Sequence, residues 1–168
     1  TSSLKRITSS VTPHWIVAFA IVSFCIAHMY GLDAPPNGHH QWRESDTAAI
    51  TLNYYQEDMN FLHPRVNQRG DSEGITGIEF PLYNYSAALI YHVTGPSHAA
   101  HRMLTILAAA VSLWMMFLIG RRMYDPWVGA IACFALAWSP LFCFYGYKIM
   151  PDIWMLTYLL TSCVAFLK

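Results

Sequence analysis

Met103–Ile119 reads MLTILAAAVSLWMMFLI, an uncharged run that decides the fold class of this chain. A hydrocarbon core about 30 Å thick needs about 20 apolar helical residues to cross it. Two other runs come near that length, Trp15–Leu32 and Trp127–Tyr145, and a fourth run, Ile153–Leu167, has only 15 residues, roughly 22 Å of helix. Of the 168 residues, 55% are hydrophobic and only 12% are charged, a balance too apolar for a soluble domain. We therefore predict an all-α polytopic membrane protein with about four transmembrane helices.

Basic residues beside these runs predict how the chain is oriented. Cytoplasmic flanks of membrane spans are enriched in Lys and Arg, and the flanking residues here are Lys5, Arg6, Arg121, Arg122 and Lys168. The N-terminus is then cytoplasmic, and every acidic residue except Asp125 lies on the outer side. The net charge is zero, so no overall field favours a nucleic-acid partner. We expect a single membrane domain over residues 1–168 of a multi-pass plasma-membrane protein, with membrane lipids as its first partners.

The outer loop, residues 33–101, is too long for a simple connection and too rich in apolar residues to be disordered. Helical spacing predicts a first amphipathic helix along Ala48, Leu52, Tyr55, Met59 and Leu62. A second amphipathic helix is predicted from Pro81 in its first turn to a stop at Gly95 and Pro96, with the apolar stripe Leu82, Tyr85, Leu89 and Val93. We expect both helices to lie in the membrane interface.

Three carboxylates occupy predicted helix N-termini: Asp46, Glu79 and Asp152. The helix dipole and the free N–H groups there favour the ionised form. Each acid taken singly is also an ordinary capping or first-turn residue. Taken together, carboxylates that converge at a wet membrane interface suit glycosyl transfer from a lipid phosphate. One would act as general base on the acceptor, and the others would position the acceptor or a cation.

Several motifs resemble one group of membrane enzymes over nearly the whole chain. They are WRESDTAA at 42–49, YY at 54–55, LHPRV at 62–66, GD at 70–71, EFPLYNY at 79–85, GRRMY at 120–124, SPL at 139–141 and MPD at 150–152. The chain resembles bacterial protein-mannosyltransferase-like enzymes of the C-type glycosyltransferase superfamily. The stretch from 42 to 85 is similar to their first outer loop.

The resemblance implies an inverting hexosyltransferase that takes a sugar from a polyprenyl-phosphate donor on the outer side. It implies that Asp46 is the catalytic aspartate, that Glu79 is the acid that opens the second interfacial helix, and that Asp152 is the aspartate of the second outer loop. The chain departs from the pattern at two positions. Thr47 stands where many relatives place a Glu, and Phe80 stands where relatives that transfer aminoarabinose place a Lys.

Candidates to hold the donor phosphate are the outer basic residues Arg43, Arg65, Arg69 and Lys148. An arginine fork matches the geometry of phosphate oxygens. Anchoring to lipid headgroups is an equally good explanation of these residues. Tyr83 and Tyr85 of the second interfacial helix are the further candidates for substrate contact.

Cofactor use stays open, with a divalent cation at Asp46 and Asp152 as the one candidate. The His39–His40 and His98–His101 pairs lack a third ligand at fixed spacing and are poor metal signatures. An alternative function also stays open, since 168 residues are roughly the first third of such an enzyme. The chain would then be a non-catalytic accessory or structural transmembrane subunit of a larger complex, for example a respiratory or photosynthetic one. A channel or transporter is a weaker alternative, because no predicted span carries an ionisable residue near its middle.

Overall fold

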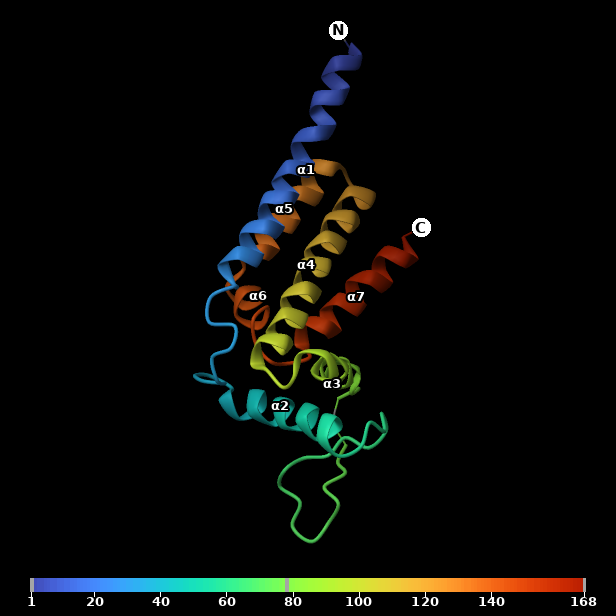
Figure 1. Ribbon diagram of the computed structural model, residues 1–168. Coiled ribbons are helices and arrows are strands. Elements are labelled where there is room, and N and C mark those ends of the chain that lie inside the picture. Colours follow the sequence, from blue (N-terminus) through green and yellow to red (C-terminus); the bar gives the residue numbers. More distant parts are fainter. Residues whose placement is uncertain (1, 78, 168) are drawn as a thin grey trace. The chain divides into compact units, whose positions relative to one another are not determined.

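The computed structural model describes residues 2–77 and 79–167, with side chains from Pro13 onward. This described part contains seven helices and no β-strand (Figure 1). The helices are α1 (Ser2–Ala27), α2 (Gln41–Gln56), α3 (Leu82–Thr94), α4 (His98–Met123), α5 (Pro126–Ala137), α6 (Pro140–Tyr145) and α7 (Asp152–Phe166). The chain forms two compact units. Residues 1–30, 106–147 and 152–168 make the helical unit, and residues 31–105 and 148–151 make the loop unit.

One described helix, α4, is long and apolar enough to cross a membrane. It contains the predicted span Met103–Ile119. Three shorter apolar helices, Pro13–Ala27, Pro126–Ala137 and Asp152–Phe166, fall within or close to the other predicted spans. The all-helical class is therefore confirmed, and the full set of four spans stays a prediction.

The predicted span Trp127–Tyr145 is wrong as one continuous helix. It is divided into α5 and α6, and Ser139 between them is extended, with φ −63° and ψ 129°. Proline disfavours helical geometry in the residue before it and has no N–H to continue a helix. Pro140 therefore accounts for the break. The Cys143 thiol donates to the Ala137 carbonyl oxygen at 3.1 Å, which partners an end group of α5.

The helical unit is built on close packing of α1 against α5. Its core consists of Val17, Ala20, Phe24, Ala108, Ala109, Leu113, Phe117, Ala130, Cys133, Ala137, Phe142 and Ile153. Hydroxyl groups of Ser112 and Thr157, 2.8 Å apart, join α4 to α7. The His28 ring lies within hydrogen-bond distance of two carbonyl oxygens, those of Phe24 in α1 and Cys143 in α6.

The connection from α4 to α5 depends on two glycines in contact. A Cβ built on Gly129 would lie 2.5 Å from the Phe117 carbonyl oxygen, and one on Gly120 would lie 2.6 Å from the Gly129 Cα. Small residues allow helix backbones to approach this closely. Any side chain at either position must therefore push the two helices apart.

We predict that Gly129→Ala destabilises the protein by about 1–3 kcal/mol, the usual cost of inserting a methyl group into a packed site. Thermal unfolding in detergent should show a lower Tm. Gly77→Ala is the matched control, because a Cβ at Gly77 meets nothing within 4 Å. Equal Tm values for the two variants would contradict the proposed close packing.

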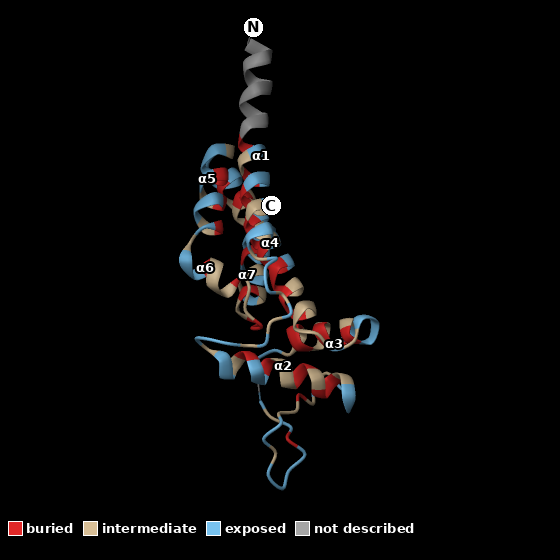
Figure 2. Ribbon diagram, turned by 60° about the vertical axis from the view of Figure 1, so that its left-hand side comes forward, coloured by how far each residue is buried: buried red, intermediate tan, exposed pale blue. Residues whose placement is uncertain are grey.

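The loop unit is built on α2 packed against α3. Buried Ile50, Tyr54 and Ala88 form its apolar centre, and the Asn84 amide donates to the Thr47 carbonyl oxygen at 2.9 Å. Buried residues recur at intervals along both helices, separated by half-buried and exposed ones (Figure 2). This unit contains the whole predicted outer loop, 33–101.

The predicted bounds of α3 are confirmed, and those of α2 are wrong. Pro81 precedes α3, and Gly95 ends it with a φ of 78°. The turn before α2 has positive φ at both Gly38 and His40, so the helix begins at Gln41 and ends at Gln56. Met59 and Leu62 therefore lie beyond α2, and Asp46 lies in its second turn rather than at its N-terminus.

The packing faces also differ from the predicted stripes. In α2 the buried residues are Glu44, Thr47, Ile50, Thr51, Asn53 and Tyr54, whereas Ala48, Leu52 and Tyr55 are only half-buried. In α3, Leu89 and Val93 of the predicted stripe are 51% and 87% exposed. The stripe of α3 is therefore not its packing face, and its placement in a membrane interface stays a prediction.

Candidate functional site

The first turn of α2 carries a buried carboxylate that the sequence prediction did not include. Glu44 is fully buried, and its Oε1 accepts from the Lys148 Nζ at 2.7 Å. Its Oε2 accepts from the Ile149 backbone N–H at 3.2 Å. The Lys148 ammonium also donates to the Asn37 carbonyl oxygen at 3.2 Å. This ion pair ties α2 to the segment 148–151 within the loop unit.

The ion pair changes the interpretation of Lys148, which we predicted as a donor-phosphate candidate. Its side chain is only 12% exposed. A buried carboxylate needs a paired cation, because isolated charges are costly away from water. Lys148 therefore has a structural partner in Glu44. The helical spacing of Glu44, Thr47 and Thr51 could have indicated a polar face of α2, but not that Lys148 is the partner of Glu44.

A polar network continues this buried face of α2 inside the loop unit. The His101 ring is hydrogen-bonded at 3.0 Å to the Thr51 hydroxyl and at 2.9 Å to the Tyr91 hydroxyl. Burial raises the pKa of Tyr91 to about 12, so its hydroxyl stays neutral at physiological pH. Three elements, α2, α3 and the first turn of α4, are thereby joined through one imidazole.

Arg43 and Glu79, two of the predicted site residues, form an ion pair. The Arg43 Nη2 lies 2.8 Å from the Glu79 Oε1, with the two side chains 32% and 54% exposed. The neighbouring residues Arg43 and Glu44 thus hold two different segments against α2. Glu79 lies three residues before the first residue of α3, Leu82. Its ion pair with Arg43 therefore holds the segment that leads into α3 against α2.

Asp46 is exposed on α2, one turn after Arg43. Residues three apart on a helix lie on neighbouring parts of its surface, so the Asp46 carboxylate and the Arg43 guanidinium share one side of α2. Within the described part of the chain, Asp46 forms no hydrogen bond or ion pair. Both acids thus belong to the loop unit: Glu79 is paired with Arg43, and Asp46 lies three residues after Arg43 on α2.

Asp152 belongs to the helical unit, where it begins α7. It is half-buried and lines a cavity of about 400 Å³ together with Ser139, Phe142, Tyr145 and apolar neighbours. Its predicted position at a helix N-terminus is confirmed. Its participation in one site with Asp46 and Glu79 stays a prediction.

Arg65 and Arg69 meet a group of carboxylates in the segment after α2. Arg69 forms a two-pronged ion pair with Glu57, at 2.9 and 2.5 Å. Arg65 lies 3.8 Å from carboxylate oxygens of Glu57, Asp58 and Glu73. The hydrogen bonds from Arg69 lower the pKa of Glu57. These contacts hold the segment against the end of α2.

The two predicted tyrosines occupy different environments. Tyr83 is buried, and its hydroxyl lies 3.1 Å from the Thr105 hydroxyl. Burial raises the pKa of Tyr83 far above its ordinary value. Tyr85 is half-buried and packs edge-on against the rings of Tyr54 and Phe61. Tyr83 therefore joins α3 to α4, and Tyr85 has the more accessible ring.

Among the described residues, no three His, Cys, Asp or Glu side chains lie close enough together to hold a metal ion. A divalent cation at Asp46 and Asp152 stays a prediction.

These features define a helical protein with one described helix long and apolar enough to cross a membrane and a separate unit rich in carboxylates and arginines. The family described as dolichyl-phosphate-mannose-protein mannosyltransferase matches residues 79–168, more than half of the chain, and the chain belongs to this family. It is a membrane glycosyltransferase-like protein. No curated protein and no solved structure matches it.

The family match covers some of the candidate residues and leaves others outside. It begins at Glu79 and includes Tyr83, Tyr85, Lys148 and Asp152. Residues 1–78, which contain Asp46, Arg43, Arg65 and Arg69, lie before it. The functional roles expected of these four residues rest on the motif resemblance and on the geometry of α2.

We predict that removing one member of the Glu44–Lys148 pair costs about 3–5 kcal/mol, because the other charge is left buried without a partner. Lys148→Met and Glu44→Gln should each lower the Tm in detergent. The double variant should recover most of the loss, because neither buried charge remains. Additive losses in the double variant would show that the pair is not coupled.

We predict that Glu57→Gln speeds tryptic cleavage after Arg69 about twofold to fivefold, the range expected for an exposed ion pair. The reason is that Glu57 holds the Arg69 guanidinium by two bonds. Cleavage is followed by mass spectrometry of timed digests. Asp71→Asn is the control, because Asp71 is exposed in the same segment and forms no ion pair among the described residues. Equal rates of tryptic cleavage after Arg69 in the two variants would show that Glu57 does not restrain Arg69.

Proposed function

We propose that this protein transfers a sugar from a polyprenyl-phosphate donor to a hydroxyl-bearing acceptor on the outer face of the membrane, with inversion at the anomeric carbon. The family membership supports the reaction class. The observation that carries the assignment of roles is the arrangement on α2, where exposed Asp46 lies one turn from Arg43 and Arg43 is paired with Glu79.

Asp46 is the proposed general base. An inverting transfer needs a carboxylate that takes the proton of the acceptor hydroxyl as its oxygen attacks the anomeric carbon. The bond from that carbon to the phosphate oxygen breaks, and the polyprenyl phosphate leaves with the electron pair. Asp46 suits this role because its carboxylate is exposed and is not committed to a partner in the described part of the chain.

Arg43 is the proposed contact for the donor phosphate. A guanidinium binds phosphate oxygens through paired hydrogen bonds, and Arg43 is the candidate cation nearest to Asp46 along α2. Its present partner, Glu79, is more than half exposed and can move into solvent when a phosphate takes its place. Glu79 and Asp152 are the proposed residues that position the acceptor or a divalent ion.

We predict that Asp46→Asn lowers transfer by about 10²–10⁴-fold, the usual contribution of a positioned general base. The assay follows release of polyprenyl phosphate from polyprenyl-phosphate mannose by the full-length protein in membrane vesicles. Folding should be unchanged, because Asp46 is exposed. Asp71→Asn, the same change at another exposed acid of the loop unit, should keep its activity.

Two results would count against the proposal. Full activity of the Asp46→Asn protein would remove Asp46 as the base. An unmodified protein that never consumes the donor would remove the transferase function itself.

A further inference from the structure

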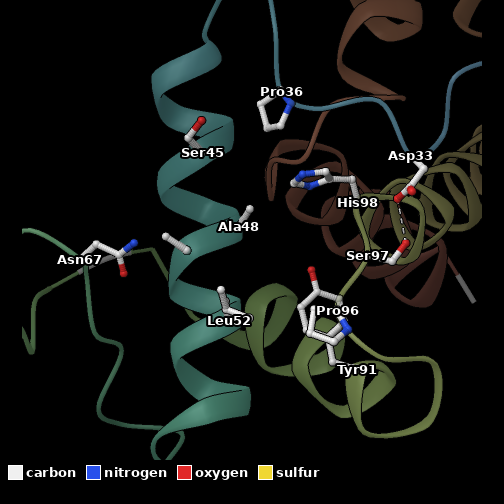
Figure 3. A pocket seen from close by; sticks show the side chains of 11 residues that line it. Asp33, Pro36, Ser45, Ala48, Leu52, Asn67, Tyr91, Pro96, Ser97 and His98 are labelled. Carbon is white, nitrogen blue, oxygen red and sulfur yellow. Dashed lines mark hydrogen bonds between the residues drawn. The ribbon is translucent and has the colours of Figure 1, made fainter.

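The loop unit contains a cavity on another side of α2 from Arg43. Its volume is about 510 Å³, and it lies between α2, the segment around Asp33 and Pro36, and the turn that leads into α4. Ser45, Ala48, Ala49 and Leu52 supply the α2 wall. Figure 3 shows the His98 ring projecting toward α2 from the opposite wall. This volume is large enough for a small organic group.

The polar groups of the cavity are held in place by one another. Asp33 accepts a hydrogen bond from the Ser97 hydroxyl at 3.0 Å and a long one from the Ala99 backbone N–H at 3.4 Å. The Ser97 hydrogen bond, followed by that of Ala99, lowers the pKa of Asp33, so the carboxylate is ionised at neutral pH. Asn67 accepts from the Asn53 amide at 3.0 Å through its carbonyl oxygen, which keeps its own N–H₂ group as a donor.

Further hydrogen-bonding capacity is unused within the described residues. The Ser45 hydroxyl is exposed on the α2 wall and has no partner among them. The His98 Nδ1 is shielded from solvent and also makes no hydrogen bond there. The cavity therefore presents a carboxylate, an amide, a hydroxyl and an imidazole from separate segments of the chain.

Charge decides which substrate the cavity suits. No Lys or Arg is among its described lining residues, and Asp33 is a fixed negative charge. A phosphate would therefore find no cation to pair with in this lining. The donor is therefore disfavoured, and a neutral group with several hydroxyls is favoured.

The position of the cavity relates it to the proposed base. Ser45 precedes Asp46, and Ala49 lies one turn after it; both line the cavity. Residues three apart are surface neighbours on a helix, so Asp46 is the neighbour of two lining residues on the surface of α2. A hydroxyl of a group held in the cavity would then lie on the side of α2 next to Asp46.

We propose that this cavity binds the acceptor and that the acceptor is a saccharide. The proposal rests on the proposed transferase function. Side chains from separate segments, set against the apolar faces of Ala48, Leu52 and Pro96, match the hydroxyls and C–H faces of a sugar. Peptides are commonly recognised by main-chain pairing at a strand edge, and the described lining offers no strand.

Binding is tested with the full-length protein in detergent by saturation-transfer difference NMR. The probes are a mixture of maltose, lactose and mannobiose, and the neutral tripeptide N-acetyl-Ala-Thr-Ala-amide. We expect signals from a disaccharide and none from the tripeptide. Ala48→Phe fills the cavity and should abolish the signals, whereas Gln56→Phe, at an exposed position of α2 outside the lining, should keep them.

A second filling variant, Ser45→Leu, is made at an exposed position and keeps the test valid if Ala48→Phe fails to fold. Binding of the tripeptide alone, absence of any disaccharide signal, or signals that survive both filling variants would overturn the saccharide assignment. Asp46→Asn should still bind the disaccharide while it loses transfer. If the protein binds a disaccharide but never transfers a sugar from the donor, the proposed transferase function is wrong and the cavity is still a saccharide-binding site.

Discussion

The buried ion pair between Glu44 and Lys148 is the constraint on which the loop unit depends. A carboxylate with no exposed surface fixes the position of its cation and of the Ile149 N–H that also binds it. Because Glu44 is in the first turn of α2, this pairing sets the rotation of the whole helix. The rotation of α2 about its axis in turn determines the direction in which each of its other side chains points.

The rotation separates three kinds of chemistry around one helix. Thr47, Ile50, Thr51 and Tyr54 point into the interior of the unit. Arg43, in the same row as Thr47 and Ile50, pairs with Glu79 from the first turn. Asp46 is exposed, and Ser45, Ala48 and Ala49 line the cavity. A helix with an apolar stripe alone could rotate at small cost. Polar partners on several sides of α2 allow one orientation only.

The sequence predicted the helical class, the longest apolar helix and the bounds of α3, because these follow from local composition and from proline and glycine at Pro81 and Gly95. It misplaced the start of α2, because positive φ at His40 is rare for a residue other than glycine. It missed the break at Ser139, although Pro140 signalled it. It also gave no sign that Lys148 pairs with Glu44, since that contact joins residues more than a hundred positions apart. The candidate acids were recognisable from motifs, whereas the cavity exists only in three dimensions.

The pairing of Arg43 with Glu79 has a consequence for the order of events in the proposed reaction. A phosphate that binds Arg43 must compete with a carboxylate already there, so donor capture is an exchange of anions and not a simple addition. The exchange releases Glu79 at the moment when the donor arrives. In the proposed reaction, donor binding at Arg43 and release of Glu79 from its ion pair are thus coupled thermodynamically.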